Sequence, residues 1–408
     1  MKYTYAQVYH RPEDRKRLTA LRDALQADGH ASETIRFFTA PGRTELGGNH
    51  TDHQHGLVLA AAVDVDTVAA VAPNDLGLVR LWSEGFPYCE ISIDPAHNPP
   101  APKESALSLL QGMAELCLPL GKPCGLDIRA SSTVLPGGGL SSSASFEVLL
   151  AEIFNALWCG EALPPMKLAE LGQRVENDWF GKPSGRLDQS ASAMGGATYM
   201  SFADPDAPVV EKLDLNLDAA GYALFIINCG ASHADLTGEY AAIPGELGKV
   251  CACFGKRVLQ EVPEADFYAR LQSLRAACGD RAVLRAMHVY GENRRVTAQR
   301  NALRRGDFPA YLELVRASGL SSWRYLQNVT PAGAAKEQPM ALTLALCEGL
   351  LAGKGACRVH GGGFAGTAQA YVPLEMADFF RTEMERVLGA GACQRRTVRA
   401  VGAAEIKL

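Results

Sequence analysis

Residues 126–157 contain the feature that most restricts how this chain can fold: a strand, a tight glycine-rich loop and a helix in immediate succession. The run LDIRASSTV (126–134) is typical of a strand and is followed by Pro136 and three glycines. From Ser141 onward, apolar residues recur at spacings of three and four, which predicts an amphipathic helix. These residues are Phe146, Leu149, Leu150, Ile153, Phe154 and Leu157. A helix that begins directly after such a loop suits an anion, because its first N–H groups are free and carry partial positive charge.

The loop itself reads PGGGLSSSAS (136–145), which favours a phosphate-binding site. Glycines allow backbone N–H groups to approach phosphate oxygens, and serine hydroxyls can reach a phosphate or a metal ion. The pattern G-x-x-x-x-G-K-[ST] is absent, so this is not a Walker loop. A flexible linker is the alternative interpretation, and the amphipathic helix that follows at once argues against it.

Elsewhere, strand and helix patterns mix without strict alternation, which predicts an α+β protein. For 408 residues we expect two packed domains. Further strands are expected over 57–72, 221–228 and 368–372, and further helices over 104–118, 265–277, 281–303 and 340–351. The segment 201–219 has two prolines and many acids, and it is the expected crossing between the domains.

Composition excludes several classes of partner. A net charge of -5 argues against nucleic acid and favours a small molecule. No run approaches the roughly 18 apolar residues that span a bilayer, and the charged first thirty residues predict a helical leader rather than a secretory signal. The eleven cysteines include no C-x-x-C pair, which is typical of reduced, buried thiols. We therefore expect a cytoplasmic protein, either a monomer or a weak homo-oligomer.

The segment APGRTELGGNHTDHQHG (40–56) lies between two strand-like runs and is unusually polar. One interpretation is an exposed hairpin loop. The other is carbohydrate recognition, because sugar hydroxyls donate and accept at once and need carboxylates, amides and imidazoles in fixed positions. Spacing alone does not decide between them.

Two later segments are candidates for the same site. The turn VHGGGFAGTAQA (359–370) precedes an apolar strand and is either structural or a second glycine-rich loop at one site. In GKPSGRLDQSASAMGG (181–196), Asp188 stands among small residues and is either a helix cap or a catalytic group. Glu176, twelve residues upstream, would by itself be interpreted as a solvated helix carboxylate.

Taken together and in this order, the four segments resemble the GHMP superfamily of small-molecule kinases, which comprises galactokinase, homoserine kinase, mevalonate kinase and phosphomevalonate kinase. The galactokinases are the most similar of these families. Their motif GRVNLIGEHTDYxxG resembles residues 42–56, GGGLSSSAS is matched without change at 137–145, and CGIMDQ resembles SGRLDQ at 184–189. A TGGGFGG-type loop resembles 360–366, and an Asn followed by S-E-Y resembles Asn228 and GEY at 238–240. The similarity runs from about Arg36 to the C-terminus.

The resemblance implies a two-domain fold and an ATP- and Mg²⁺-dependent sugar kinase. The expected organisation is a helical leader at 1–34, an N-terminal domain like ribosomal protein S5 domain 2 at 35–210, and a ferredoxin-like C-terminal domain at 211–408. Sugar and nucleotide would bind between the two domains. The implied reaction transfers the γ-phosphate of ATP to the anomeric hydroxyl of galactose.

The resemblance also implies roles for individual residues. Asp188 would accept the proton of the attacking hydroxyl, and Arg43 would hold that hydroxyl and offset charge on the phosphoryl group. Glu176 would hold Mg²⁺ together with Ser142 or Ser143, which are oxygen ligands as a hard cation prefers. The loop that would bind the nucleotide phosphates consists of Gly137, Gly138, Gly139, Leu140, Ser141, Ser142, Ser143 and Ala144. The sugar would be bound by Asn49, His50, Asp52, Tyr240, Gly361 and the backbone around Gly185.

The chain departs from the galactokinase motif at Asn49, where those proteins carry Glu. Tyr is also replaced by His53, and residues 44–47 differ. An amide can still bind galactose. Losing a negative charge would also tolerate a substrate with a carboxylate at C6, so a galacturonate 1-kinase is the main alternative. A non-catalytic sugar sensor on the same fold is a third hypothesis, which the intact 141–145 loop, Asp188 and Arg43 disfavour.

Overall fold

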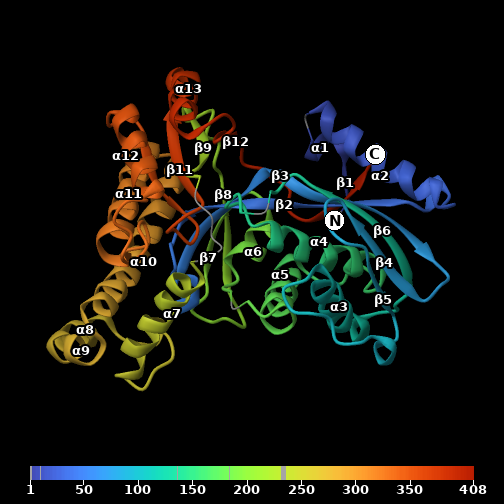
Figure 1. The fold of residues 1–408 in the computed structure, drawn as a ribbon, viewed down its shortest axis with the longest axis horizontal. Coiled ribbons are helices and arrows are strands. Elements are labelled where there is room, and N and C mark those ends of the chain that lie inside the picture. The colour runs from blue at the N-terminus through green and yellow to red at the C-terminus, as the bar shows by residue number, and fades with distance from the viewer. Residues whose placement is uncertain (1, 10, 136, 183, 231–235) are drawn as a thin grey trace.

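The protein is described by a computed structural model that covers residues 2–9, 11–135, 137–182, 184–230 and 236–408 (Figure 1). Pro136 of the predicted phosphate loop and Pro183 of the Asp188 segment lie outside these residues. The strands are β1 (Lys2–Thr4), β2 (Arg36–Gly47), β3 (Leu57–Asn74), β4 (Leu78–Ser83), β5 (Cys89–Ser92), β6 (Gly125–Ser132), β7 (Ala197–Ser201), β8 (Val209–Leu213), β9 (Tyr222–Asn228), β10 (Ala356–His360), β11 (Thr367–Pro373), β12 (Cys393–Arg396) and β13 (Ala404–Lys407).

The helices surround two separate sheets. They are α1 (Tyr5–Val8), α2 (Pro12–Ala27), α3 (Ala106–Cys117), α4 (Ser142–Leu157), α5 (Pro165–Arg174), α6 (Leu187–Met194), α7 (Thr237–Ala252), α8 (Glu264–Ala269), α9 (Leu271–Cys278), α10 (Asp280–Arg304), α11 (Phe308–Ser321), α12 (Pro339–Leu351) and α13 (Ala377–Leu388). Two π-helical segments, η5 (Val175–Phe180) and η7 (Ser322–Leu326), extend α5 and α11. Among the described residues, no helix is both long and apolar enough to cross a membrane. The mixture of sheets and helices confirms the predicted α+β class.

The larger sheet has the order β1-β13-β2-β3-β6-β4-β5, with β7 and β8 added beside β3. Its two faces are covered by different helices (Figure 1). Phe38 and Ala69 point to a core shared with α3, α4 and α5, whereas their neighbours Phe37 and Val68 point to a core shared with α2. This alternation is the period of two that a strand imposes on side chains.

The smaller sheet is antiparallel, in the order β10-β11-β9-β12. It also separates two cores. Phe225 on β9 packs with Phe380 of α13 and Leu344 of α12, whereas the adjacent Leu224 packs with side chains of α11. The predicted strands at 221–228 and 368–372 and the helix at 340–351 are confirmed by β9, β11 and α12.

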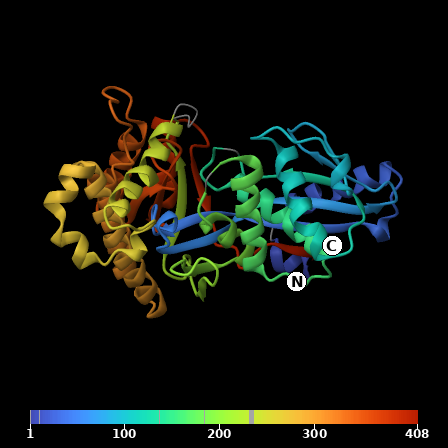
Figure 2. The ribbon, with the colours of Figure 1, turned by 90° about the horizontal axis from the view of Figure 1, so that it is seen from below.

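Strands β2 and β3 link the two halves of the molecule. They form a long antiparallel hairpin that runs from the half that holds both termini into the half formed by α7–α13 (Figure 2). The tip of the hairpin is fixed to α10: the Gly48 N–H donates to Glu292 Oε1 at 3.1 Å, and the Leu57 N–H donates to Asn293 Oδ1 at 2.9 Å. The polar segment 48–56 is therefore held between the two halves.

Several expected boundaries differ in the structure. Part of the predicted crossing, 201–219, is the edge strand β8, which pairs with β7, so the connection to the smaller sheet is only 214–221. The predicted helix at 265–277 is two helices, α8 and α9. The leader contains the expected helix α2 but begins with β1, which pairs in parallel with β13. Strand β13 itself pairs with β2, so the end of the chain returns to the larger sheet.

One buried carboxylate anchors α2 and the C-terminal segment to the larger sheet. Asp66 on β3 accepts hydrogen bonds from Tyr9, Thr39 and the guanidinium groups of Arg17 and Arg399. Burial alone would raise the pKa of Asp66, but the two guanidinium groups lower it to about 2. The charged form is therefore the one that stabilises the fold.

We expect Asp66→Asn to lower the free energy of unfolding by about 3 kcal/mol near neutral pH, because two buried guanidinium groups lose their counter-charge. In the unfolded chain, an aspartate has its usual pKa of about 3.9. The stabilisation by Asp66 is thus complete above that pKa and is lost as the pH falls through the folded value of about 2. Urea unfolding of both proteins at a series of pH values measures this. The difference between them should shrink below about pH 4, and a constant difference would contradict the account. Asp378→Asn, at a carboxylate that is 96% exposed, is the control.

Candidate active site

Arg43 is positioned by an irregularity in β2. The register between β2 and β3 shifts between Pro41 and Arg43, which is where a bulge can redirect a side chain. The Arg43 N–H donates to the Leu140 carbonyl at 3.0 Å, so the strand is tied to the glycine-rich loop. A Cβ on the adjacent Gly42 would lie 2.9 Å from the same carbonyl oxygen, which explains why glycine stands there. The guanidinium is almost fully buried.

Arg43 and Asp188 form a two-point ion pair. Nε lies 2.6 Å from Oδ1 and Nη2 lies 2.7 Å from Oδ2, the forked geometry that makes such pairs strong. The Ser141 hydroxyl also donates to Asp188 Oδ2 at 2.6 Å, and Arg43 Nη1 donates to the Gly139 carbonyl at 2.6 Å. The pair is thereby attached to the glycine-rich loop on both sides.

The ionisation state of Asp188 follows from these contacts. Burial alone would raise its pKa, but the Arg43 guanidinium and the Ser141 hydroxyl lower the pKa to about 2. Asp188 lies in the first turn of α6, where the helix dipole also favours negative charge. The carboxylate is therefore ionised, and its side chain keeps 33% exposure, so it can meet a ligand.

The glycine-rich loop leads into α4 as the sequence predicts. Gly137, Gly139 and Ser141 have positive φ values of 73°, 72° and 59°. Ser141 is the N-cap residue of α4, yet its side chain makes no cap hydrogen bond to the helix, since its hydroxyl is donated to Asp188. The N–H groups of the first turn thus have no side-chain cap, and this end of α4 is suited to an anion.

The two glycine-rich segments meet, although more than 200 residues separate them in the sequence. A Cβ on Gly139 would lie 2.0 Å from Thr367 Oγ1 and 3.2 Å from His360 Nδ1. Burial, followed by the charge of Arg43, holds the pKa of His360 well below its usual value, so the ring is neutral. The segments 359–370 and 137–145 are therefore in contact, as the hypothesis of one shared site requires.

Glu176 is buried in η5 close to the start of α4. Its Oε1 accepts from the Ser143 hydroxyl at 3.1 Å and from Lys182 Nζ at 3.0 Å, and its Oε2 accepts from Gln189 Nε2 at 2.9 Å. The interpretation as a solvated helix carboxylate is therefore wrong. Of the two candidate serines, Ser143 is the one that the structure pairs with Glu176.

These oxygens fit a magnesium ion in kind and number. Mg²⁺ is commonly held by one or two protein oxygens, with phosphate and water as the remaining ligands. Across the residues that the structure describes, no group of three or more acidic, His or Cys side chains converges on one point. The Ser143 hydroxyl and the Glu176 carboxylate lie beside the uncapped end of α4. They are the kind of oxygen ligands that bind Mg²⁺ together with phosphate and water.

The segment 48–56 brings Asp52 to the same site. A Cβ on Gly185 would lie 1.8 Å from Asp52 Oδ2, so the backbone that precedes α6 contacts this carboxylate directly. His50 Nε2 donates to the Gly362 carbonyl at 3.0 Å, and burial, together with the nearby His53, lowers the pKa of His50 to about 3. The predicted residues Asp52 and Gly185 are thus brought together, and His50 lies against the C-terminal glycine-rich segment at Gly362.

Tyr240 on α7 approaches the C-terminal glycine-rich segment. Its hydroxyl donates to the Gly363 carbonyl at 2.7 Å, and a Cβ on Gly362 would lie 2.6 Å from its ring. Tyr240 and His50 therefore both contact the segment that contains the predicted residue Gly361: Tyr240 at Gly363 and His50 at Gly362.

Asn49 has a different orientation from the one that its predicted role requires. The residue is fully buried. Its Nδ2 donates to Glu45 Oε1 at 3.1 Å and to the Gly361 carbonyl at 2.7 Å, and its Oδ1 accepts from Asn328 Nδ2 at 2.8 Å. Both amide hydrogens and the amide oxygen are used within the protein. Direct contact with a ligand would break one of these bonds, so the structure does not support the predicted substrate contact.

Three further residues belong to this site and were not assigned roles from the sequence: Lys182, Gln189 and Glu147. Gln189 Nε2 contacts the carboxylates of both Glu176 and Glu147. Burial raises the pKa of Glu147 well above its usual value, and the nearby Glu176 charge adds to the effect. Gln189 is the last residue of the motif SGRLDQ, and Glu147 lies two residues after the segment 136–145. Their positions in or beside a motif could have identified both residues.

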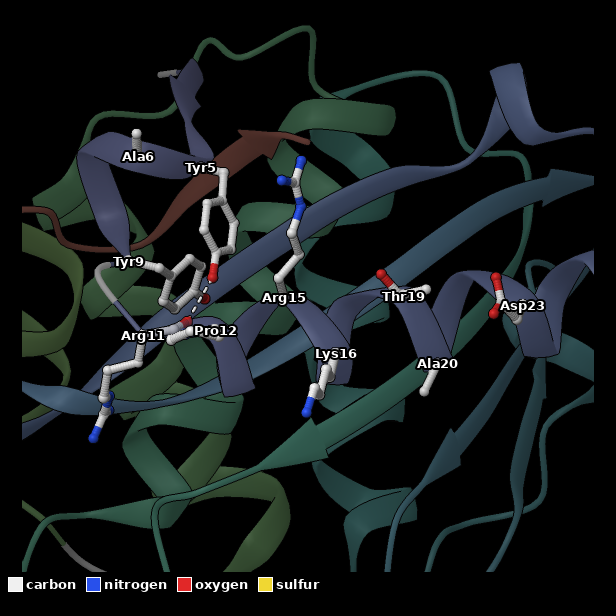
Figure 3. Close-up of a pocket in the computed structure, with 10 residues that line it drawn as sticks. All are labelled: Tyr5, Ala6, Tyr9, Arg11, Pro12, Arg15, Lys16, Thr19, Ala20 and Asp23. Carbon is white, nitrogen blue, oxygen red and sulfur yellow. Dashed lines mark hydrogen bonds between the residues drawn. The ribbon is translucent and has the colours of Figure 1, made fainter.

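A separate hollow of about 720 Å³ lies at the N-terminal elements and contains none of the predicted site residues (Figure 3). Its lining residues come from α1, α2 and the segment between them, and they include Tyr5, whose hydroxyl donates to the Arg11 carbonyl at 2.7 Å.

Two families of known proteins and several individual proteins are similar to this chain. Residues 107–196 match the family described as GHMP kinases N terminal domain, and residues 27–73 match the galactokinase galactose-binding signature. A galactokinase of Streptomyces coelicolor is 32% identical over 364 residues, which are 88% of this chain and 90% of that protein. The crystal structure of Lactococcus lactis galactokinase complexed with galactose superposes with a TM-score of 0.79 at 26% identity, covering 96% of this chain and 100% of that chain. A mevalonate kinase of Methanococcus jannaschii shares the fold, with a TM-score of 0.62 at 13% identity over 89% of this chain and 98% of that chain.

Proposed function

The chain belongs to the galactokinase family, and we propose that it transfers the γ-phosphoryl group of ATP to the C1 hydroxyl of galactose. Membership establishes an ATP-dependent sugar kinase with the GHMP kinase fold. The single observation that carries the choice of catalytic groups is the Arg43–Asp188 ion pair, which Ser141 joins to the phosphate-binding loop. Arg43 and Asp52 lie within residues 27–73, which match the galactose-binding signature, and Asp188 lies within residues 107–196, which match the GHMP kinase N-terminal domain.

In the proposed reaction the C1 oxygen attacks the γ-phosphorus, the bond between that phosphorus and the β,γ-bridging oxygen breaks, and ADP leaves. The hydroxyl proton passes to Asp188 and then to solvent. Arg43 holds the attacking oxygen and offsets charge on the transferring group. Because phosphoryl transfer has a loose transition state, positioning and electrostatics supply most of the catalysis.

The low pKa of Asp188 determines when it accepts the proton. A carboxylate with a pKa of about 2 is a weak base toward a neutral sugar hydroxyl. The hydroxyl becomes strongly acidic only as its oxygen bonds to phosphorus. Asp188 therefore orients the hydroxyl first and takes its proton late in the transfer.

The phosphates and the metal would be held by the start of α4. We propose that the loop 137–144 binds the phosphate oxygens through its backbone, and that Ser143 and Glu176, with Ser142 adjacent, hold Mg²⁺. The bound ion would supply charge neutralisation at the β- and γ-phosphates. The donor pair at 3.1 Å supports this assignment.

The sugar would lie between Asp52, His50 and Tyr240, against the backbone at Gly185 and Gly361. The galacturonate alternative depended on the loss of a carboxylate at Asn49. Glu45 lies 3.1 Å from that amide, so a carboxylate remains in this region, buried and paired with Arg358. Because Arg358 neutralises this carboxylate, the proposal of galactose rests on the galactokinase relatives and on the galactose-binding signature at 27–73.

We also propose that the site is assembled by the predicted domains 35–210 and 211–408, since its residues come from both. A cytoplasmic location would supply ATP and keep the cysteines reduced. We expect a monomer or a weak homo-oligomer, because every proposed ligand residue is present in one chain.

We expect Gly185→Ala to raise the KM for galactose by about tenfold, because the new methyl group would displace Asp52. The KM for ATP should change little, since the phosphate loop is untouched. Steady-state kinetics with each substrate varied in turn measure both constants. Gly349→Ala, on α12 with open space at its Cβ, is the control. An unchanged galactose KM would remove Asp52 from the sugar site.

A coupled ADP-release assay with ATP and Mg²⁺ tests the proposed function. The acceptors are galactose, galacturonate, N-acetylgalactosamine, glucose, homoserine and mevalonate. We expect turnover with galactose. Turnover with galacturonate but not galactose would select the alternative, and no turnover with any acceptor would revive the sugar sensor.

A further inference from the structure

Lys182 contacts the carboxylate that is proposed to hold the metal. Its Nζ lies 3.0 Å from Glu176 Oε1, the same oxygen that accepts from the Ser143 hydroxyl. Glu176 is 3% exposed at its side chain, whereas Lys182 is 61% exposed. The lysine therefore reaches from the surface onto a buried carboxylate and covers the oxygen that a cation would use.

The backbone places Lys182 at this position. The π-helical segment η5 carries Glu176 and is followed by its C-cap residue Gly181, which has a φ of 91°. The Gly181 and Lys182 N–H groups both donate to the Glu176 carbonyl at 3.0 Å. Because the chain reverses at Gly181, the Lys182 side chain lies beside the Glu176 carboxylate. π-Helical turns are frequent at functional sites.

The charges around Lys182 indicate that its ammonium group serves as the counter-ion of Glu176. Burial raises the pKa of Glu147 well above its usual value, and Asp188 is paired with Arg43. Glu176 is then the remaining buried carboxylate at this site that needs a counter-charge, and Lys182 supplies it. Lys182 also contributes to the low pKa of Asp188, so its ammonium lies within electrostatic range of the catalytic pair.

We propose that Lys182 is an exchangeable counter-ion: it neutralises Glu176 until a divalent cation binds there, and then binds the phosphate group of the nucleotide. The inference rests on the proposed function in that it takes Glu176 as the metal carboxylate. Two cations cannot share Oε1 without strong repulsion, so the metal must displace the ammonium. The displaced ammonium is a compact point charge on a flexible stem, which suits a phosphate.

The proposal predicts two effects of opposite sign for Lys182→Gln. Without nucleotide, the variant should bind Mn²⁺ about fivefold more tightly than the wild type, because the metal no longer competes with a partly exposed ion pair. With EDTA present and no metal, the variant should bind ATP about fivefold more weakly, because the negative charge of Glu176 then faces the phosphates without its counter-ion. Electron paramagnetic resonance of free Mn²⁺ measures the first, and titration calorimetry measures the second.

Three variants serve as controls. Lys103→Gln makes the same change of charge beside Gly181 and should alter neither affinity. Lys182→Arg keeps the charge, so its affinities for Mn²⁺ and for ATP should be close to those of the wild type. In a Glu176→Gln background, Lys182→Gln should no longer affect Mn²⁺.

Either of two results would overturn the proposal: an Mn²⁺ affinity of Lys182→Gln equal to that of Lys103→Gln, or unchanged metal-free binding of ATP. Neither measurement requires sugar or turnover. Failure of the proposed galactose kinase activity would therefore be visible separately.

Discussion

Asp188→Asn should lower kcat with galactose by about 10³-fold, because the variant can neither accept the hydroxyl proton nor balance the charge of Arg43. The amide has nearly the same shape as the carboxylate and can still accept a hydrogen bond. Binding of galactose should therefore survive, and the rise in unfolding temperature caused by the sugar should remain close to that of the wild type. Stopped turnover with retained binding is the expected combination.

The control for this variant is Asp178→Asn, an exposed carboxylate on the neighbouring segment η5. It should keep wild-type kcat. If Asp188→Asn retained more than a small fraction of the wild-type kcat, the proton would have to go elsewhere and the assignment of Asp188 would fail. If it lost both turnover and sugar-dependent stabilisation, Asp188 would be needed for binding rather than for transfer.

Arg43→Met should reduce kcat/KM by about 10³-fold, since a guanidinium that stabilises a transferring phosphoryl group contributes at least that much in related chemistry. The shape of the pH profile should also change. In the wild type the pKa of Asp188 is about 2, so the carboxylate stays ionised across the assay range. Without Arg43, burial raises that pKa against only the weaker opposing effects of the Ser141 hydroxyl and Lys182. The residual activity of the variant should then fall as the pH is lowered, in a range where the wild type is constant.

Arg43→Lys separates charge from geometry. It keeps a positive charge but loses the two-point contact, so its activity should lie between those of the wild type and Arg43→Met, with little change in the pH profile. If the activity of Arg43→Met did not fall as the pH is lowered, Arg43 would not control the ionisation of Asp188.

The parts of the fold that could be predicted are those with local periodicity. The strand at 57–72 and the helix after Ser141 were recognised from apolar spacing, and the phosphate loop between strand and helix from its glycines and serines. Strand β2 was not recognised between residues 40 and 47, because Pro41 and the glycines are typical of a loop. Two shifts in the register between β2 and β3 accommodate those residues within the sheet, and side-chain spacing does not reveal them.

The candidate site was predictable in membership more than in geometry. The motifs identified Arg43 and Asp188, and the family resemblance added Glu176; the structure places all three around the start of α4. The direction in which Asn49 points could not be read from its residue type, because it depends on Asn328 and Gly361, far along the chain. Glu147 likewise meets Gln189 only through the packing of α4 against α6, and Lys182 meets Glu176 through the reversal of the chain at Gly181.

Identification of the product tests the central claim most directly. The protein would be incubated with ATP, Mg²⁺ and galactose labelled with ¹³C at C1, and the product would be followed by ³¹P and ¹³C NMR. The account predicts one equivalent of ADP for each sugar phosphorylated, and coupling of the labelled carbon to phosphorus as expected for galactose 1-phosphate. A phosphate on another hydroxyl, or ADP release without a phosphorylated sugar, would contradict it.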